Sequence, residues 1–165
     1  MILRVSKLSL RGIITTNGKK IATLQDILYD PQQLKIASLY VSKSNLLVDS
    51  KLLPLKDINS FNVNGIVIDS EKKLTNTSSS DSYRGILREG ENRVFLNTML
   101  KDEQTEYGVI KDIFFETSTG VVIGIEYIPK NSKQTKTMKI EHIIKLDSQA
   151  TIVRPIMVRN AQANQ

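Results

Sequence analysis

The chain has 165 residues, enough for one ordinary domain or two small ones, and its 40% hydrophobic and 24% charged residues are typical of a globular protein. It contains no cysteine, which excludes disulfides, thiolate metal sites and a cysteine nucleophile. The net charge of +6 is uneven, because residues 1–25 carry five basic side chains and no acid, and residues 130–165 carry seven basic side chains and two acids. We interpret these basic ends as solvated surface, with a face for an anionic partner as the alternative.

The beginning of the chain alternates apolar and polar residues over Met1–Leu10 and lacks the apolar run of a signal peptide. No segment approaches the roughly 18 to 20 apolar residues that span a bilayer. We therefore expect a soluble, cytoplasmic protein without integral membrane association.

Short β-rich runs follow one another along the chain, and aliphatic residues must build their core because aromatics make up only 5%. Asn17-Gly18 stands between a β-rich run and Ile21, and Asn64-Gly65 stands between two such runs; both predict hairpins with type I′ turns, in which both central residues have positive φ. No window keeps a helical period for 11 residues, and Leu55–Ile58 predicts one helical turn at most. The runs are Ile13–Thr16, Ile36–Val41, Phe61–Val63, Ile66–Ile68, Val94–Leu96, Val121–Ile128 and Thr151–Val153.

Two polar segments divide the chain. Residues 71–82, which read EKKLTNTSSSDS, predict a linker, and residues 160–165 predict a frayed tail. The expected organisation is a first module over residues 1–70 and a second over residues 83–159.

The two modules align with each other. At an offset of 86, residues 8–41 meet 94–127 without a gap, so that Ile13 meets Met99, Ile14 meets Leu100 and Asp26 meets Asp112. At an offset of 85, Leu55 meets Ile140, Ile58 meets Ile143 and Val67-Ile68 meets Ile152-Val153. Apolar residues meet apolar residues and acids meet acids, which indicates a duplication and predicts two small antiparallel barrels.

Each unit resembles the PRC-barrel family. The resemblance rests in the first unit on Gly12, Leu24, Asp26–Asp30, Ile36, Leu39, Leu55, Ile58 and Gly65–Ile68, and in the second on Gly108, Ile110, Asp112–Glu116, Gly120, Gly124, Ile140 and Ile143. Ala22 and Thr98 depart from the family pattern, which has glycines at those places. The resemblance implies binding and scaffolding modules without shared catalytic residues, of the kind found in a ribosome-maturation factor and in the reaction-centre H subunit.

Four acids and one histidine are the candidates for chemistry. Asp26, Asp30, Asp112 and Glu116 could form carboxylate pairs for acid–base work or a divalent ion, but each pair precedes a turn, where such side chains accept hydrogen bonds from backbone amides. His142 is the only histidine and has no partner motif. We interpret the acids as structural and expect no catalytic residues, no metal site and no cofactor.

Lysines are the candidate binding residues. Lys130, Lys133, Lys136 and Lys139 recur at every third position without an acid, and Lys19 and Lys20 add charge near the other end. Such side chains give sequence-independent attraction to phosphates.

We therefore expect an all-β, non-catalytic interaction or adaptor protein that binds a protein partner, with ribosomal RNA as a second candidate partner. The alternatives are a metal-dependent or acid–base hydrolase that uses the turn carboxylates, and a scaffold in a membrane-associated complex.

Overall fold

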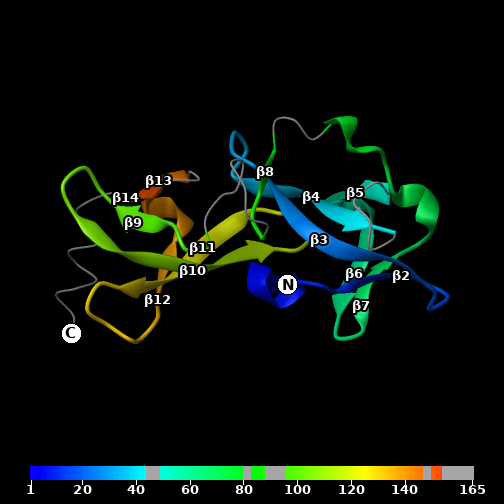
Figure 1. Cartoon of the computed structure of the whole chain (residues 1–165), viewed down its shortest axis with the longest axis horizontal. Coiled ribbons are helices and arrows are strands. Elements are labelled where there is room, and N and C mark those ends of the chain that lie inside the picture. The colour runs from blue at the N-terminus through cyan, green and yellow to red at the C-terminus, as the bar shows by residue number, and fades with distance from the viewer. Residues whose placement is uncertain (44–48, 80–82, 88–95, 147–149, 154–165) are drawn as a thin grey trace.

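The computed structural model describes residues 1–43, 49–79, 83–87, 96–146 and 150–153 (Figure 1). In this part of the chain, two sheets of seven strands each account for the fold, and the helices are single 3-10 turns. None of these helices is long and apolar enough to cross a membrane. The 3-10 turns are η1 (Val5–Leu8), η3 (Leu55–Asp57), η4 (Glu71–Lys73), η5 (Thr77–Ser79) and η6 (Ile140–His142).

The first sheet pairs its strands in the order β5-β4-β3-β2-β7-β6, with β8 added against β3. The second has the order β12-β11-β10-β9-β14-β13, with β1 added against β10. The first sheet contains β2 (Gly12–Thr15), β3 (Lys20–Asp30), β4 (Lys35–Ser42), β5 (Ser50–Pro54), β6 (Ile58–Asn62), β7 (Gly65–Ile68) and β8 (Arg84–Gly85). The second contains β1 (Ile2–Arg4), β9 (Met99–Lys101), β10 (Glu106–Glu116), β11 (Val122–Pro129), β12 (Lys136–Lys139), β13 (Ile143–Leu146) and β14 (Ala150–Val153).

The two sheets repeat one topology down to the register. Asp26 lies opposite Tyr40 on β4 after a bulge that follows Leu24, and Asp112 lies opposite Glu126 on β11 after the same bulge. In each sheet one pairing is parallel, β2 with β7 and β9 with β14, and the other pairings are antiparallel. The all-β prediction is therefore confirmed. The pairing forms an open path in each sheet, so the predicted closure into barrels is not seen.

The pairing of the strands β2 and β9 shows that the sequence alignment of the two units is wrong by one residue at this place. Ile13 lies opposite Ala22, and Leu100 lies opposite Gly108, so Ile13 corresponds to Leu100 and not to Met99. Both Ile13 and Leu100 are fully buried. The hairpin loop of the second unit is one residue shorter, which an ungapped comparison of alternating sequences does not reveal.

The predicted hairpins form, but their turns differ from type I′. Only the glycine has a positive φ in each, 85° at Gly18 and 152° at Gly65. At the first hairpin, Gly18 N–H donates to Thr15 O and Thr15 N–H donates to Lys19 O, which describes a type I turn followed by a glycine bulge. The helical turn expected at Leu55–Ile58 is present as η3.

The predicted linker has structure of its own. It contains η4 and η5, and between them Thr75 pairs with Leu52 on the outer edge of β5, with N–H to O distances of 2.9 and 2.8 Å. The predicted strand at Val94–Leu96 and the tail at 160–165 fall wholly or mostly outside the described residues; Leu96 itself lies in a turn.

The segments that precede the two units are exchanged. β1, which comes before the first unit, pairs with β10 of the second sheet, and β8, which comes before the second unit, pairs with β3 of the first (Figure 1). The exchange is symmetrical, because Arg4 lies opposite Phe114 and Gly85 lies opposite the corresponding Leu28. Val5 and Ile86, the next residue of each segment, are fully buried.

The tips of two hairpins join the sheets a second time. Ile36 N–H donates to Gly120 O at 2.7 Å and Val122 N–H donates to Leu34 O at 3.3 Å, around a bridge between Lys35 and Val121. These partners are equivalent residues of the two units, so the contact is one between matching surfaces. One hydrophobic cluster accordingly runs through both sheets, and in it the Phe61 and Phe115 rings pack edge to face at 6.4 Å.

Candidate functional site

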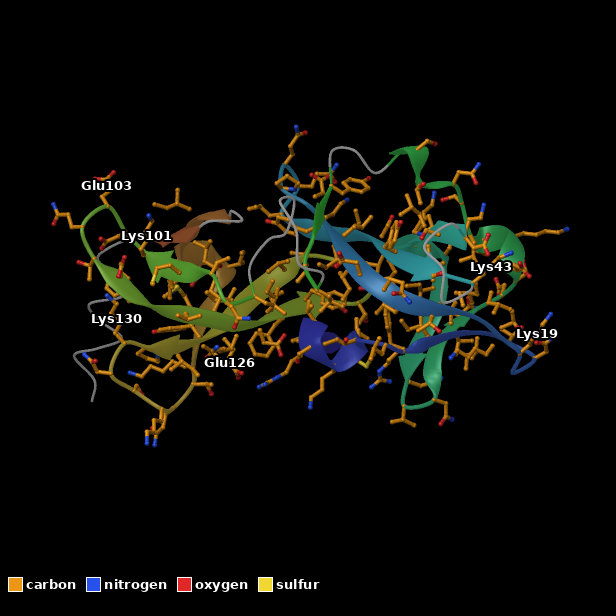
Figure 2. All side chains as sticks on the ribbon, in the orientation of Figure 1. Lys19, Lys43, Lys101, Glu103, Glu126 and Lys130 are labelled. Atoms are coloured by element: carbon orange, nitrogen blue, oxygen red, sulfur yellow. The ribbon has the colours of Figure 1, made fainter. Side chains whose placement is uncertain are left out.

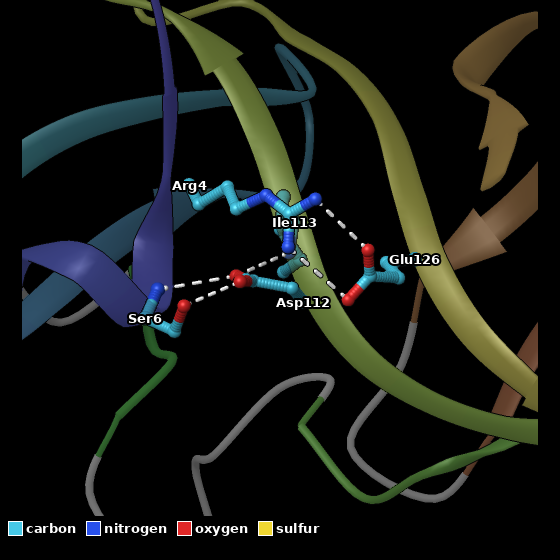
Figure 3. A network of polar contacts seen from close by, with 5 residues as sticks. All are labelled: Arg4, Ser6, Asp112, Ile113 and Glu126. Carbon is cyan, nitrogen blue, oxygen red and sulfur yellow. Dashed lines mark hydrogen bonds and ion pairs between the residues drawn. The ribbon is translucent and has the colours of Figure 1, made fainter. Parts of the chain in front are cut away.

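Asp112 is a buried carboxylate that holds the exchanged N-terminal segment (Figure 3). Its Oδ1 accepts hydrogen bonds from Ile113 N–H at 2.9 Å and Ser6 N–H at 3.1 Å, and its Oδ2 accepts one from Ser6 Oγ. Beside it, Arg4 forms an ion pair with Glu126 at 3.0 Å and stacks over the Phe114 ring at 4.9 Å. These contacts fix the segment on β10.

Asp26 does the same for the other exchanged segment. Its Oδ1 accepts from Ile27 N–H at 2.7 Å, from Ile86 N–H at 3.0 Å and from Leu87 N–H at 2.8 Å. The side chain is 6% exposed. Sequence reasoning placed Asp26 and Asp112 before turns, whereas the structure places both in the middle of long strands, with their oxygens directed to backbone donors of the opposite unit.

Asp30 and Glu116 stand at the ends of the same strands. Asp30 Oδ1 accepts from Gln32 N–H at 2.9 Å and Gln33 N–H at 3.2 Å, which caps the turn after β3. Glu116 Oε1 accepts from the Met1 amino group at 2.6 Å, and this bond lowers the pKa of Glu116. Within the described ranges, no three acids, histidines or cysteines converge on a place that could hold a metal ion.

His142 lies in η6 beside Glu141, with 3.5 Å between Nε2 and Oε1. Both residues line a cavity of about 550 Å³ on the second sheet, whose floor and walls include Ile2, Phe114 and Met138. Burial raises the pKa of Tyr127, another lining residue. Apolar and polar residues both line the cavity, a combination that suits binding of a side chain or small ligand.

The first sheet has a smaller cavity of about 380 Å³ at the matching place. Ala37 and Ser38 line it where Ile123 and Gly124 line the larger one, and Leu52 stands where Thr137 stands. Thr75, which pairs with the edge of β5, also lines the smaller cavity. On the second sheet, no described segment occupies that place, and the outer edge of β12 has no partner strand among the described residues.

The structure separates the six candidate lysines. Lys19 and Lys130 lie at opposite ends of the molecule (Figure 2), so the two basic regions do not form a single face. Lys130 forms an ion pair with Glu106 at 2.6 Å. Lys136 and Lys139 belong to β12, Lys139 lines the larger cavity, and Lys133 is exposed in the loop before that strand. Lys20 begins β3, next to Lys19.

Sequence reasoning therefore missed the cavity and the open edge next to it. The lysine spacing indicated the segment that contains β12, but the aromatic and aliphatic residues of the cavity also come from the β10–β11 hairpin and from β1, which the strand exchange adds to β10. No protein-family model matches the chain, and comparison with curated proteins finds no match either.

Proposed function

We propose that this chain is a non-catalytic interaction protein, built from two PRC-barrel-like units, that binds a protein partner through the cavity and the β12 edge of its second sheet. The observation that carries the proposal is a difference between equivalent positions of the two sheets, namely the outer edges of β5 and β12 and the cavities beside them. The first sheet has its edge covered by the chain itself at Thr75, whereas the second presents a cavity beside β12, whose outer edge pairs with none of the described segments.

The carboxylates support a non-catalytic reading. Asp26 and Asp112 are the two acids that the hydrolase alternative needs most, and they are 6% and 3% exposed. Their oxygens accept hydrogen bonds from backbone amides and a serine hydroxyl, so they stabilise the strand exchange and do not face a substrate.

The composition of the cavity supports a protein partner over RNA. Ile2, Phe114, Ile123, Tyr127 and Met138 give the cavity an apolar and aromatic part, and an acid, Glu141, lines it beside Lys139. Apolar surface is typical of the centres of protein interfaces, whereas phosphate contacts depend on cations and are opposed by an acid. Of the six candidate lysines, only Lys139 lines this cavity.

The test is a pull-down with a variant that fills the cavity. Thr137 is exposed and lines the cavity, so Thr137→Tyr adds bulk there without entering the core. Thr135→Tyr, exposed in the preceding loop, is the matched control. A protein retained by the wild type and by Thr135→Tyr, identified and purified, should lose binding to Thr137→Tyr. Retention that depends on RNA, and disappears after nuclease treatment, would contradict the proposal.

A further inference from the structure

In the first sheet, one residue of the chain itself pairs with the outer edge of β5 through an isolated β-bridge. Thr75 lies antiparallel to Leu52 of β5 and exchanges both backbone hydrogen bonds with it. The neighbouring Leu74 packs against the hydrophobic core, and Asn76 Oδ1 accepts a hydrogen bond from Lys51 Nζ at 2.9 Å. One short segment thus supplies backbone pairing, an apolar contact and a polar contact.

β12 is the counterpart of β5 in the second sheet. Leu52 lies opposite Tyr40, and Thr137 lies opposite Glu126, which is the residue equivalent to Tyr40. Because alternate residues of an edge strand direct their N–H and C=O groups outward, Thr137 presents the pair of groups that Leu52 gives to Thr75. Lys136 then occupies the place of Lys51.

The side chains at these equivalent positions of β5 and β12 differ in exposure. Leu52 is 2% exposed beneath its cover, whereas the corresponding Thr137 is exposed. The cavity beside Thr137 is about 550 Å³ against about 380 Å³ beside Leu52, where Thr75 lines the space. An added strand on β12 would therefore place its central side chain in a cavity that accepts a residue larger than threonine.

The charges select the partner. Lys136 and Lys139 are both on β12, and Lys133 precedes them in the loop. Resting on the proposed function, we propose that β12 binds an extended acidic segment of a protein partner as an additional antiparallel strand. Its central apolar side chain enters the cavity, an apolar residue precedes it as Leu74 precedes Thr75, and acidic residues face Lys136 and Lys139.

The register defines the probe. In an antiparallel addition the central residue faces Thr137, the next residue faces Lys136, and the residue two before the centre faces Lys139. The hexapeptide Ser-Asp-Val-Leu-Glu-Ser, blocked at both ends and labelled with fluorescein, has leucine at the centre and acids at the two lysines. Its binding to the full chain is measured by fluorescence polarisation.

Two changes, one in the peptide and one in the protein, each remove one backbone hydrogen bond of the proposed pairing. A peptide with N-methylated leucine lacks the N–H that corresponds to Thr75 N–H. Thr137→Pro lacks the outward N–H of the strand, and proline is tolerated at an edge where the N–H faces solvent. Each change should weaken binding at least about tenfold, as expected for loss of one hydrogen bond with an unpaired partner. Thr135→Pro, before the strand, should bind within about twofold of the wild type, the range of an uninvolved surface change.

A further pair of measurements tests the charges. A peptide with Asn in place of Asp and Gln in place of Glu should bind less tightly than the acidic peptide. A double variant of the protein, Lys136→Gln with Lys139→Gln, should bind the two peptides equally well. If Thr137→Pro does not fold, the N-methylated peptide against the wild type tests the same pairing.

Equal binding of the N-methylated and parent peptides would overturn strand addition. So would absence of peptide binding together with binding of a single-stranded RNA that weakens in the double lysine variant and not in Thr137→Pro. Loss of the purified partner in Thr137→Tyr, with normal binding by Thr137→Pro, would overturn strand addition and leave binding of a protein partner at the cavity intact.

Discussion

Asp26 and Asp112 occupy the same position in the two sheets, and each carboxylate accepts hydrogen bonds from the segment that precedes the opposite unit, Asp26 from two backbone amides and Asp112 from the amide and hydroxyl of Ser6. Each acid also accepts a hydrogen bond from the amide of the residue that follows it. The pair therefore holds together the two pieces of chain that the fold exchanges.

Removing either acid should destabilise the protein. Asp26→Ala leaves the buried amides of Ile27 and Ile86 without an acceptor, and Asp112→Ala leaves the buried amide of Ile113 without one, which should cost about 1 to 3 kcal/mol in the free energy of unfolding. Asp30→Ala is the control, because its partners Gln32 and Gln33 are exposed and water can replace the carboxylate. Urea unfolding followed by circular dichroism checks this; equal stability of wild type and both buried variants would contradict the role.

The hairpin contact between the sheets should be sensitive at Gly120. This residue has a φ of +75°, and an added Cβ would lie 2.2 Å from Ile36 O, inside the contact that joins the units. Gly18 has a similar φ of +85°, but an added Cβ would meet no atom within 4 Å. Gly18→Ala thus measures only the free-energy cost of placing a residue with a Cβ in a left-handed backbone conformation, about 1 to 2 kcal/mol.

Gly120→Ala should lower the melting temperature more than Gly18→Ala does. The excess reports the clash with the backbone of the other unit. If both variants melt at the same temperature, the hairpin contact adds little to stability.

The exchange predicts that the two halves depend on each other. Cutting the chain after residue 79 gives fragments 1–79 and 80–165, each of which carries the strand that the other sheet needs. Neither should form a folded monomer, and mixing them should restore the native near-ultraviolet circular dichroism. A folded monomer of either fragment, detected by analytical ultracentrifugation and NMR, would argue against a structural role of the exchange.

The ion pair between Lys130 and Glu106 predicts a pH effect. The hydrogen bond from Lys130, and next its charge, lower the pKa of Glu106 from its ordinary value of 4.5. Stabilisation by this pair is therefore present above pH 4.5 and is lost as the pH falls through the lowered pKa.

In Lys130→Gln the pKa of Glu106 should return towards its ordinary value, as an NMR titration of the side-chain carboxyl can show. Lys133→Gln, for which the described residues show no ion pair, is the control. An unchanged Glu106 titration in Lys130→Gln would mean that the contact is not populated in solution.

The sequence predicted the strands of the core and the equivalence of Asp26 with Asp112, because alternation and the repeated acid depend on local pattern. It missed the shift that brings Leu100 into the place of Ile13, since a one-residue change in a hairpin loop leaves both alternations intact. It predicted positive φ at Asn17, but the hairpin closes with a positive φ at Gly18 alone.

The candidate site was less accessible to sequence reasoning. β1 and β8 have three and two residues, too few to carry a period, so their exchange could not be predicted. The cavity depends on that exchange, because Ile2 of β1 lines it. The distance between Lys19 and Lys130 depends on how the sheets are joined, which composition does not encode.

Because of the strand exchange, a single copy of the unit could not complete its own sheet. One unit on its own would have a sheet that lacks an added strand and a leading segment that has no sheet to join. Two identical chains would satisfy both needs by a twofold arrangement, with the hairpin tips meeting on the axis as Lys35 and Val121 do within this chain. The duplicated chain thus has the internal geometry of a symmetric dimer whose subunits are covalently joined. The two halves are nevertheless not identical, because Thr75 pairs with the edge of β5 whereas no described segment pairs with the equivalent edge of β12.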